Sequence, residues 1–214
     1  MKKFTELVFI IDKSGSMSGL ESDTIGGFNS LINKQKREEG DAFVSVVFFN
    51  DKSDVLLDRV NIKDVKELTE DDYVCISCTA LLDAVGDSIK HIKNIHKYAR
   101  KEDIPEKTVF VIITDGLENA SKKYRYYDVK KLIERVKEES KWEFLFLGAN
   151  IDAIGEAKNL GIEKDYAVEF CCDERGIELN YESVSNAVKI MRCCDKKIGS
   201  GWKKDIEEDL KKRK

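Results

Sequence analysis

The stretch "LVFIIDKSGSM" (residues 7–17) runs five apolar residues directly into an aspartate and two serines that flank a glycine. A continuous apolar run of this length is typical of a strand covered on both faces, as in a parallel sheet flanked by helices. The polar side chains that follow, Asp12, Ser14 and Ser16, are therefore expected where a buried strand reaches the edge of its sheet.

Four further apolar runs of strand length follow, at residues 43–49, 108–114, 142–148 and 166–170. Stripes of apolar residues at helical spacing lie between or after them, around 25–32, 81–99, 129–136 and 184–191. Residues 51–60 alternate like a short edge strand, and the connection through Asn50 and Asp51 indicates an antiparallel hairpin with 43–49. The alternation predicts an α/β fold with a doubly wound, Rossmann-like, mostly parallel sheet and helices on both faces.

The chain of 214 residues is 42% hydrophobic, enough for one well-buried core, and no Gly/Ser/Pro linker divides it. We expect one domain over residues 1–195 and a charged C-terminal segment over 196–214. That segment is interpreted as a helix that docks through Trp202, Ile206 and Leu210, or as a partly frayed tail. Two glycines in the helical pattern, Gly26 and Gly27, indicate a close approach of that helix to the sheet.

Charge and hydropathy argue against two classes of partner. The net charge is −4 with the signs interspersed, which does not favour nucleic-acid binding. No stretch approaches the roughly 18–20 apolar residues of a membrane span. The apolar run after "MKKF" is too short for a signal peptide, so a cytoplasmic protein is expected.

Six cysteines occupy three short clusters, Cys75 with Cys78, Cys171 with Cys172, and Cys193 with Cys194. Without an export signal they are expected to be reduced, small buried thiols. Two alternatives stay open. Oxidation of Cys75 and Cys78 would displace the adjacent Thr79, or zinc would bind this pair together with one of the Cys-Cys pairs.

Oxygen donors gather at the predicted switch point of the sheet, between its first and fourth strands. The first strand delivers Asp12, Ser14 and Ser16, with Gly15 leaving the backbone free to curl. Strand 108–114 delivers Thr114 and Asp115, and Thr79 is expected at the N-cap of the helix that follows it. The two carboxylates and the three hydroxyls of Ser14, Ser16 and Thr79, with no histidine or thiolate required, suit Mg²⁺, or Mn²⁺ as a substitute.

Three segments, in order along the chain, resemble von Willebrand factor type A domains, of the intracellular bacterial or phage-like type. "DKSGSM" matches their DxSxS element, "CTALLDA" is similar to their central threonine segment, and "IITDGLEN" to their second aspartate segment. The resemblance covers roughly residues 4–170 and implies strand order 3-2-1-4-5-6 with one antiparallel edge strand. It also implies a metal-ion-dependent adhesion site with Asp12, Ser14, Ser16, Thr79 and Asp115 as ligands. In the family the serines commonly ligate directly, whereas the threonine and aspartates alternate between direct and water-mediated contact.

The expected function is metal-dependent protein binding without catalysis, in which a partner's Asp or Glu carboxylate completes the coordination. The partial positive charge of the helix N-terminus near Thr79 is expected to favour that carboxylate. A scaffold subunit that works beside an AAA+ ATPase is an alternative of the same class.

The alternative from another class is a Mg²⁺-dependent phosphohydrolase, which needs a second carboxylate where this chain has Ser14. The P-loop motif of nucleotide hydrolases is absent, and His91 and His96 are expected far from Ser14 and Ser16, which disfavours a serine hydrolase. Glu118 and Asn119 either shape the ligand surface or cap the following turn.

Overall fold

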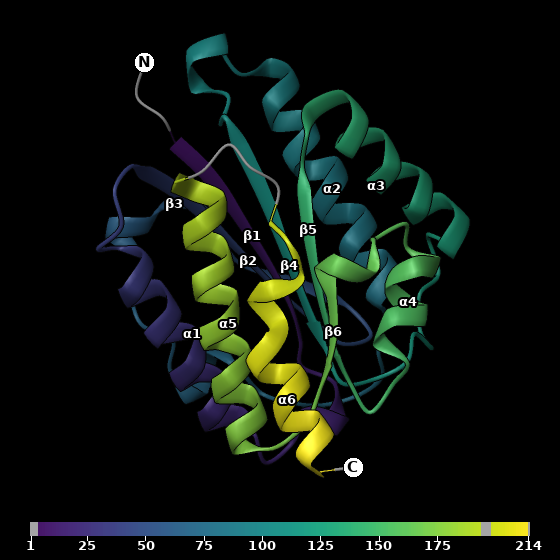
Figure 1. Ribbon diagram of the computed structural model, residues 1–214. Coiled ribbons are helices and arrows are strands. Elements are labelled where there is room, and N and C mark those ends of the chain that lie inside the picture. The colour runs from purple at the N-terminus through teal and green to yellow at the C-terminus, as the bar shows by residue number, and fades with distance from the viewer. Residues whose placement is uncertain (1–3, 194–197, 214) are drawn as a thin grey trace.

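A computed structural model describes residues 4–193 and 198–213 and contains a six-stranded sheet between two layers of helices (Figure 1). The strand order is β3-β2-β1-β4-β5-β6. Only β2 and β3 pair antiparallel, and the other neighbours are parallel. The predicted α/β class, strand order and antiparallel edge are all confirmed.

The strands are β1 (Phe4–Asp12), β2 (Asp41–Phe49), β3 (Ser53–Asn61), β4 (Lys107–Thr114), β5 (Glu143–Ala149) and β6 (Ala167–Phe170). The helices are α1 (Glu21–Gln35), α2 (Leu81–Tyr98), α3 (Tyr126–Ser140), α4 (Ala153–Asn159), α5 (Glu174–Cys193) and α6 (Lys204–Arg213). Of these, only α4 has no counterpart among the helical stripes of the sequence.

The apolar run of β1 serves both faces of the sheet. Leu7, Phe9 and Ile11 face the layer of α1, α5 and α6, whereas Val8 and Ile10 face α2, α3 and α4. Because every second side chain enters a different core, both sets must be apolar. This is why the strand reads as a continuous run.

The C-terminal segment forms a docked helix rather than a frayed tail. Helix α6 lies beside β6 and α5 (Figure 1), with Ile206 only 2% exposed. The indole Nε1 of Trp202 donates a hydrogen bond to the backbone oxygen of Asp165 at 2.8 Å. Leu210 is half-buried, so it contributes less than expected. The domain boundary expected at 195/196 lies outside the described residues.

The two glycines of α1 differ in their surroundings. A Cβ on Gly27 would overlap the ring of Tyr181 on α5, whereas a Cβ on Gly26 would meet nothing within 4 Å. The close approach is therefore between two helices, at Gly27 alone. The expectation of a close approach to the sheet was wrong, because α5 packs beside α1 and supplies the neighbour.

Candidate metal centre

Strand β1 ends in a turn that brings two hydroxyls together. Asp12 is the last residue of the strand, and its Oδ1 accepts a hydrogen bond from the backbone N–H of Ser14 at 2.7 Å. A 3₁₀ turn over Gly15–Met17 then places the Oγ atoms of Ser14 and Ser16 3.1 Å apart. The carboxylate of Asp12 thus holds the turn that presents the two serines.

Strand β4 supplies the second carboxylate, next to the first. The Oγ of Ser16 donates to Oδ1 of Asp115 at 2.6 Å, across 99 positions of sequence. Thr114, the last residue of β4, donates from Oγ1 to Oδ2 of Asp12, also at 2.6 Å. Direct hydrogen bonds therefore join the ends of the two strands at the predicted switch point of the sheet.

Thr79 reaches the same cluster from the loop before α2. A Cβ built on Gly116 would lie 3.0 Å from Oγ1 of Thr79 and 3.6 Å from Oγ of Ser16, so both hydroxyls flank this glycine. Asn119 fixes Thr79 from both sides. Its Oδ1 accepts from the backbone N–H of Thr79 at 2.9 Å, and its own backbone N–H donates to the backbone carbonyl oxygen of Thr79 at 3.0 Å.

The position of Thr79 relative to helix α2 differs from the expectation. The N-cap residue of α2 is Ala80, without a side-chain cap, so the N-cap assignment of Thr79 was wrong. The carboxylate of Glu118 caps the helix instead, because its Oε2 accepts from the N–H of Leu82 at 2.9 Å. Glu118 therefore offsets the positive end of α2, and the expected attraction of a partner carboxylate to that end loses its basis.

A second loop, residues 73–78, is tied to the turn after β1. The Tyr73 hydroxyl donates to the backbone oxygen of Asp12, and the N–H of Ile76 donates to the Lys13 oxygen at 2.9 Å. The N–H of Gly15 donates to the Ser77 oxygen at 3.1 Å. The φ of Gly15 is not positive, so the turn does not use the special freedom of glycine that the sequence suggested.

The electrostatics of the cluster are those of buried negative charge. Asp12 and Asp115 are 0% and 3% exposed, and within residues 4–193 and 198–213 their hydrogen-bond partners are all uncharged groups. Burial raises the pKa of Asp12 to about 6, and the nearby Asp115 carboxylate adds to the rise. Burial also raises the pKa of Asp115. A buried carboxylate without a positive partner is costly, so this cluster favours a cation.

One neighbour of the cluster was not predicted. The Sγ of Cys172 lies 3.7 Å from Oδ2 of Asp115, as a donor to the carboxylate oxygen that does not face Ser16. Cys172 follows β6, at the same edge of the sheet as the ends of β1 and β4. Its position two residues after the end of a strand was the available signal. In the sequence, Cys172 stands beside Cys171, and this pairing does not indicate a relation to the oxygen donors.

Solved structures resemble this chain in fold at low sequence identity. The vWF domain of the type V pili tip protein Mfa5 from Porphyromonas gingivalis is 11% identical, with a TM-score of 0.62, over 92% of this chain and 99% of that one. A von Willebrand factor type A structure from Catenulispora acidiphila is 13% identical, with a TM-score of 0.60, over 87% of this chain and 43% of that one. Proximal thread matrix protein 1 from the mussel byssus, solved with a zinc-occupied MIDAS motif, is 16% identical, with a TM-score of 0.58, over 88% of this chain and 46% of that one.

The chain has the von Willebrand factor type A fold. It spans less than half the length of the mussel and Catenulispora chains, so what those whole proteins do does not carry over with the fold. No protein-family model matches the sequence, and no curated protein matches it either.

The donors present at the switch point of this type A fold fit a hard divalent cation. Carboxylates and hydroxyls are the ligands that Mg²⁺ and Mn²⁺ prefer. Four of the five predicted residues are buried, whereas Ser16 is exposed, so the cluster opens to solvent beside this serine. No group of three or more His, Cys, Asp or Glu in the described part of the chain is placed to hold a metal. The described cysteines are free.

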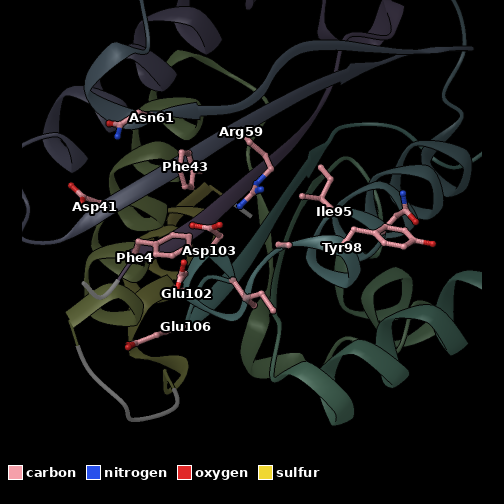
Figure 2. Close-up of a pocket in the computed structure, with 13 residues that line it drawn as sticks. Phe4, Asp41, Phe43, Arg59, Asn61, Ile95, Tyr98, Glu102, Asp103 and Glu106 are labelled. Carbon is pink, nitrogen blue, oxygen red and sulfur yellow. The ribbon is translucent and has the colours of Figure 1, made fainter. Parts of the chain in front are cut away.

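A cavity of about 960 Å³ lies at the opposite end of the strands from this cluster. Figure 2 shows it between the start of β1, the end of β3 and the end of α2. The two histidines are also remote from the serines, since His91 contacts Asp58 on β3 and His96 contacts Glu6 near the start of β1. No helix in the described ranges is long and apolar enough to cross a membrane.

Proposed function

We propose that this protein is a cytoplasmic binding module that captures a partner protein through Mg²⁺, with Mn²⁺ as a substitute. Asp12, Ser14, Ser16, Thr79 and Asp115 would hold the metal. The observation that carries the proposal is the pair of buried carboxylates, Asp12 and Asp115, which lie among the hydroxyls of Ser14, Ser16 and Thr79. Within the part of the chain that the structure describes, all hydrogen-bond partners of the two carboxylates are uncharged. Such a cluster is poorly stabilised until a cation joins it.

The five residues have different expected roles at the metal. The hydroxyls of Ser14 and Ser16 and the carboxylate of Asp115 form one connected group and are the best placed to contact the metal directly. Asp12 is fully buried, and both of its oxygens accept short hydrogen bonds from Ser14 and Thr114, at 2.7 and 2.6 Å. Only one oxygen of Asp115 accepts a bond this short, so Asp12 is the carboxylate suited to orient the turn and to act through water. When bound, the metal supplies a coordination position that accepts a carboxylate oxygen from the partner.

Exposed apolar side chains surround the cluster and favour a protein as the partner. Val74 and Ile76, on the loop tied to the turn after β1, are 56% and 59% exposed. Leu117, next to the glycine that separates Thr79 and Ser16, is 59% exposed. A partner that carries an acidic residue among apolar neighbours would cover these side chains on binding.

A catalytic role has less support from the geometry. A serine hydrolase would need a histidine base beside the serines, but the described histidines contact Asp58 and Glu6. The phosphohydrolase would need a second carboxylate at position 14, where this chain has a serine. We therefore propose binding without catalysis. Turnover of a phosphate ester that Asp12→Ala abolishes would favour the phosphohydrolase instead.

The site is tested by thermal unfolding with and without Mg²⁺. At about a hundredfold excess over Kd, binding stabilises the fold by about 2.7 kcal/mol. That corresponds to a rise in Tm of roughly 5–10 °C for a chain of this size. The Ser14→Ala, Ser16→Ala double variant is expected to lose the rise. Ser18→Ala with Ser22→Ala is the matched control, because both serines are exposed and lie nearby.

A rise in Tm that persists in the Ser14, Ser16 variant would place the metal elsewhere. The binding role itself is tested by affinity purification from the native cell, with and without EDTA. A partner that the chelator releases is the expected result, and an AAA+ ATPase among such partners would identify the scaffold role. Partners that EDTA leaves bound, to the double variant as well as to the native chain, would contradict the proposal.

A further inference from the structure

A second charged cluster lies at the far edge of the sheet, away from the hydroxyls. Glu6 on β1 is 0% exposed, and its two oxygens have different partners. Oε1 accepts from Nε of Arg59 on β3 at 2.6 Å, and Oε2 is 2.5 Å from Nε2 of His96 on α2. A fully buried carboxylate thus fixes one arginine and one histidine that lie 53 and 90 positions away in the chain.

The backbone around Arg59 is irregular in a way that directs its side chain. The pairing of β2 with β3 shifts register between Val44 and Val47, opposite this part of β3. Arg59 adopts a left-handed φ of 51°, and its N–H donates to the Ser45 hydroxyl at 3.0 Å. A non-glycine residue in this region is strained, and bulges commonly redirect a side chain. Here the distortion turns Arg59 toward Glu6 and the large cavity.

The guanidinium of Arg59 is held on one side and open on the other. Its carbon lies 5.0 Å from the centre of the Phe43 ring, which packs edge-on against Phe4 with ring centroids 5.5 Å apart. Only Nε has a hydrogen-bond partner among the described side chains, and the two terminal nitrogens have none there. Figure 2 shows the guanidinium pointing into the cavity, toward the space beside Phe4 and Phe43.

The cavity has the size and lining of a small-ligand site. Its volume is about 960 Å³, and its apolar lining comes from Phe4, Phe43, Ile95 and Ile104. Four carboxylates also line it, those of Asp41, Glu102, Asp103 and Glu106. None of them is within ion-pair distance of Arg59. Asp41 pairs with Lys63 at 3.8 Å, and Glu102 and Asp103 pair with Arg100, so part of this negative charge is offset. The negative charge that remains repels a dianion such as a phosphate monoester about twice as strongly as a single negative charge beside the arginine.

We propose that this cavity, which we call the Arg59 pocket, binds an apolar or aromatic molecule that carries one carboxylate. The two terminal nitrogens of Arg59 form a planar fork that matches the two oxygens of a carboxylate. Phe4, Phe43 and Ile95 cover the apolar body. Glu6 and His96 are positioning residues, since the buried carboxylate holds the fork at a fixed angle through Nε. This inference does not depend on the metal site.

The ligand has two possible sources, a small organic acid or the carboxyl terminus of a peptide. The probes are therefore 3-phenylpropionate and N-acetyl-Gly-Gly-Phe, each paired with its uncharged amide, and phenyl phosphate as the dianion. Binding to the full chain, in EDTA, is followed by NMR of the Arg59 Nε–H and the Trp142 indole N–H. Trp142 reports on the pocket because its ring contacts His96, with centroids 5.4 Å apart.

At least one acid is expected to bind at millimolar concentration, and about tenfold more tightly than its amide, with shifts confined to residues that line the pocket and to His96 and Trp142 behind it. Which acid binds better identifies the source. Arg59→Lys keeps the charge and removes the fork, so the acid is expected to bind about tenfold more weakly. Arg135→Lys, at an exposed arginine on α3, is the control and is expected to change nothing.

Equal binding of acid and amide, or no binding of either acid, would overturn the proposal. So would a folded Arg59→Lys variant that retains the native affinity, because Arg59 would then only join the strands. If that variant fails to fold, the comparison of acid with amide on the native chain still tests whether the pocket binds a carboxylate. Preference for phenyl phosphate over both acids would contradict the monoanion requirement.

Discussion

Protonation of Asp12 offers a quantitative test of the buried negative cluster. Its pKa rises from the ordinary 3.8 to about 6 in the folded chain. The folded state therefore binds this proton more tightly than the unfolded state between these two values. Since each pKa unit is worth about 1.4 kcal/mol, the carboxylate costs the metal-free fold about 3 kcal/mol at neutral pH.

The change of stability with pH has the opposite sign to that caused by a salt-bridged aspartate. In EDTA, the contribution of Asp12 to stability is expected to improve as the pH falls from about 7 to about 4, by up to about 3 kcal/mol. Saturating Mg²⁺ should reverse the trend, because protons compete with the metal for the cluster. The stabilisation by Mg²⁺ is therefore expected to shrink as the pH falls through the pKa of Asp12, about 6.

The assay is urea unfolding, followed by the fluorescence of the buried Trp142 and Trp202, at a series of pH values. Other groups titrate in the same range, so the native chain is compared with Asp12→Asn at each pH. The variant loses hydrogen bonds from Ser14 and Thr114, which shifts its baseline. Only the pH-dependent part of the difference in unfolding free energy between the two chains measures the protonation of Asp12. A difference in EDTA that stays constant from about pH 7 to about pH 4 would refute the reasoning.

Two further predictions concern other parts of the chain. Gly26→Ala is expected to stabilise the fold by about 0.5–1 kcal/mol, because its Cβ meets open space in a helix, whereas Gly27→Ala is expected to destabilise it through overlap with Tyr181. Equal effects in urea unfolding would contradict the packing described for α1 and α5. Cys78 is exposed, whereas burial raises the pKa of Cys75 to about 12. Iodoacetamide is therefore expected to alkylate Cys78 at least about a hundredfold faster, measured by peptide mass mapping, and equal rates would keep a paired redox role open.

The sheet was predictable because its signal is repeated in every strand. Buried parallel strands must be apolar on both faces, so "LVFII" and the run at 108–114 stand out at any position in the chain. Helix α4 left no comparable signal. At seven residues, Ala153–Asn159, it makes only two turns, too few for an apolar stripe to repeat.

That the candidate residues lie close together was predictable, whereas their individual contacts were less so. Strand ends fix where Asp12, Ser14, Ser16 and Asp115 lie, and their spacing is visible in the sequence. Which carboxylate caps α2 depends on a loop 36 positions away, and no local pattern links Glu118 to Leu82. The N-cap at Thr79 was predicted from the hydroxyl preference alone, and a tertiary contact overrode that preference.

The hydrogen bond from Ser16 to Asp115 has a consequence for the speed and heat of metal uptake. The hydroxyls and the carboxylate already lie together without a ligand, held by bonds among themselves and by the loop at 73–78. Metal uptake then requires rotation of hydroxyl hydrogens rather than ordering of a loop. The centre is preorganised, so association is expected to be limited by dehydration of the ion, with little change in heat capacity. The loss of conformational entropy that assembly of the metal centre requires has therefore already occurred when the sheet folds.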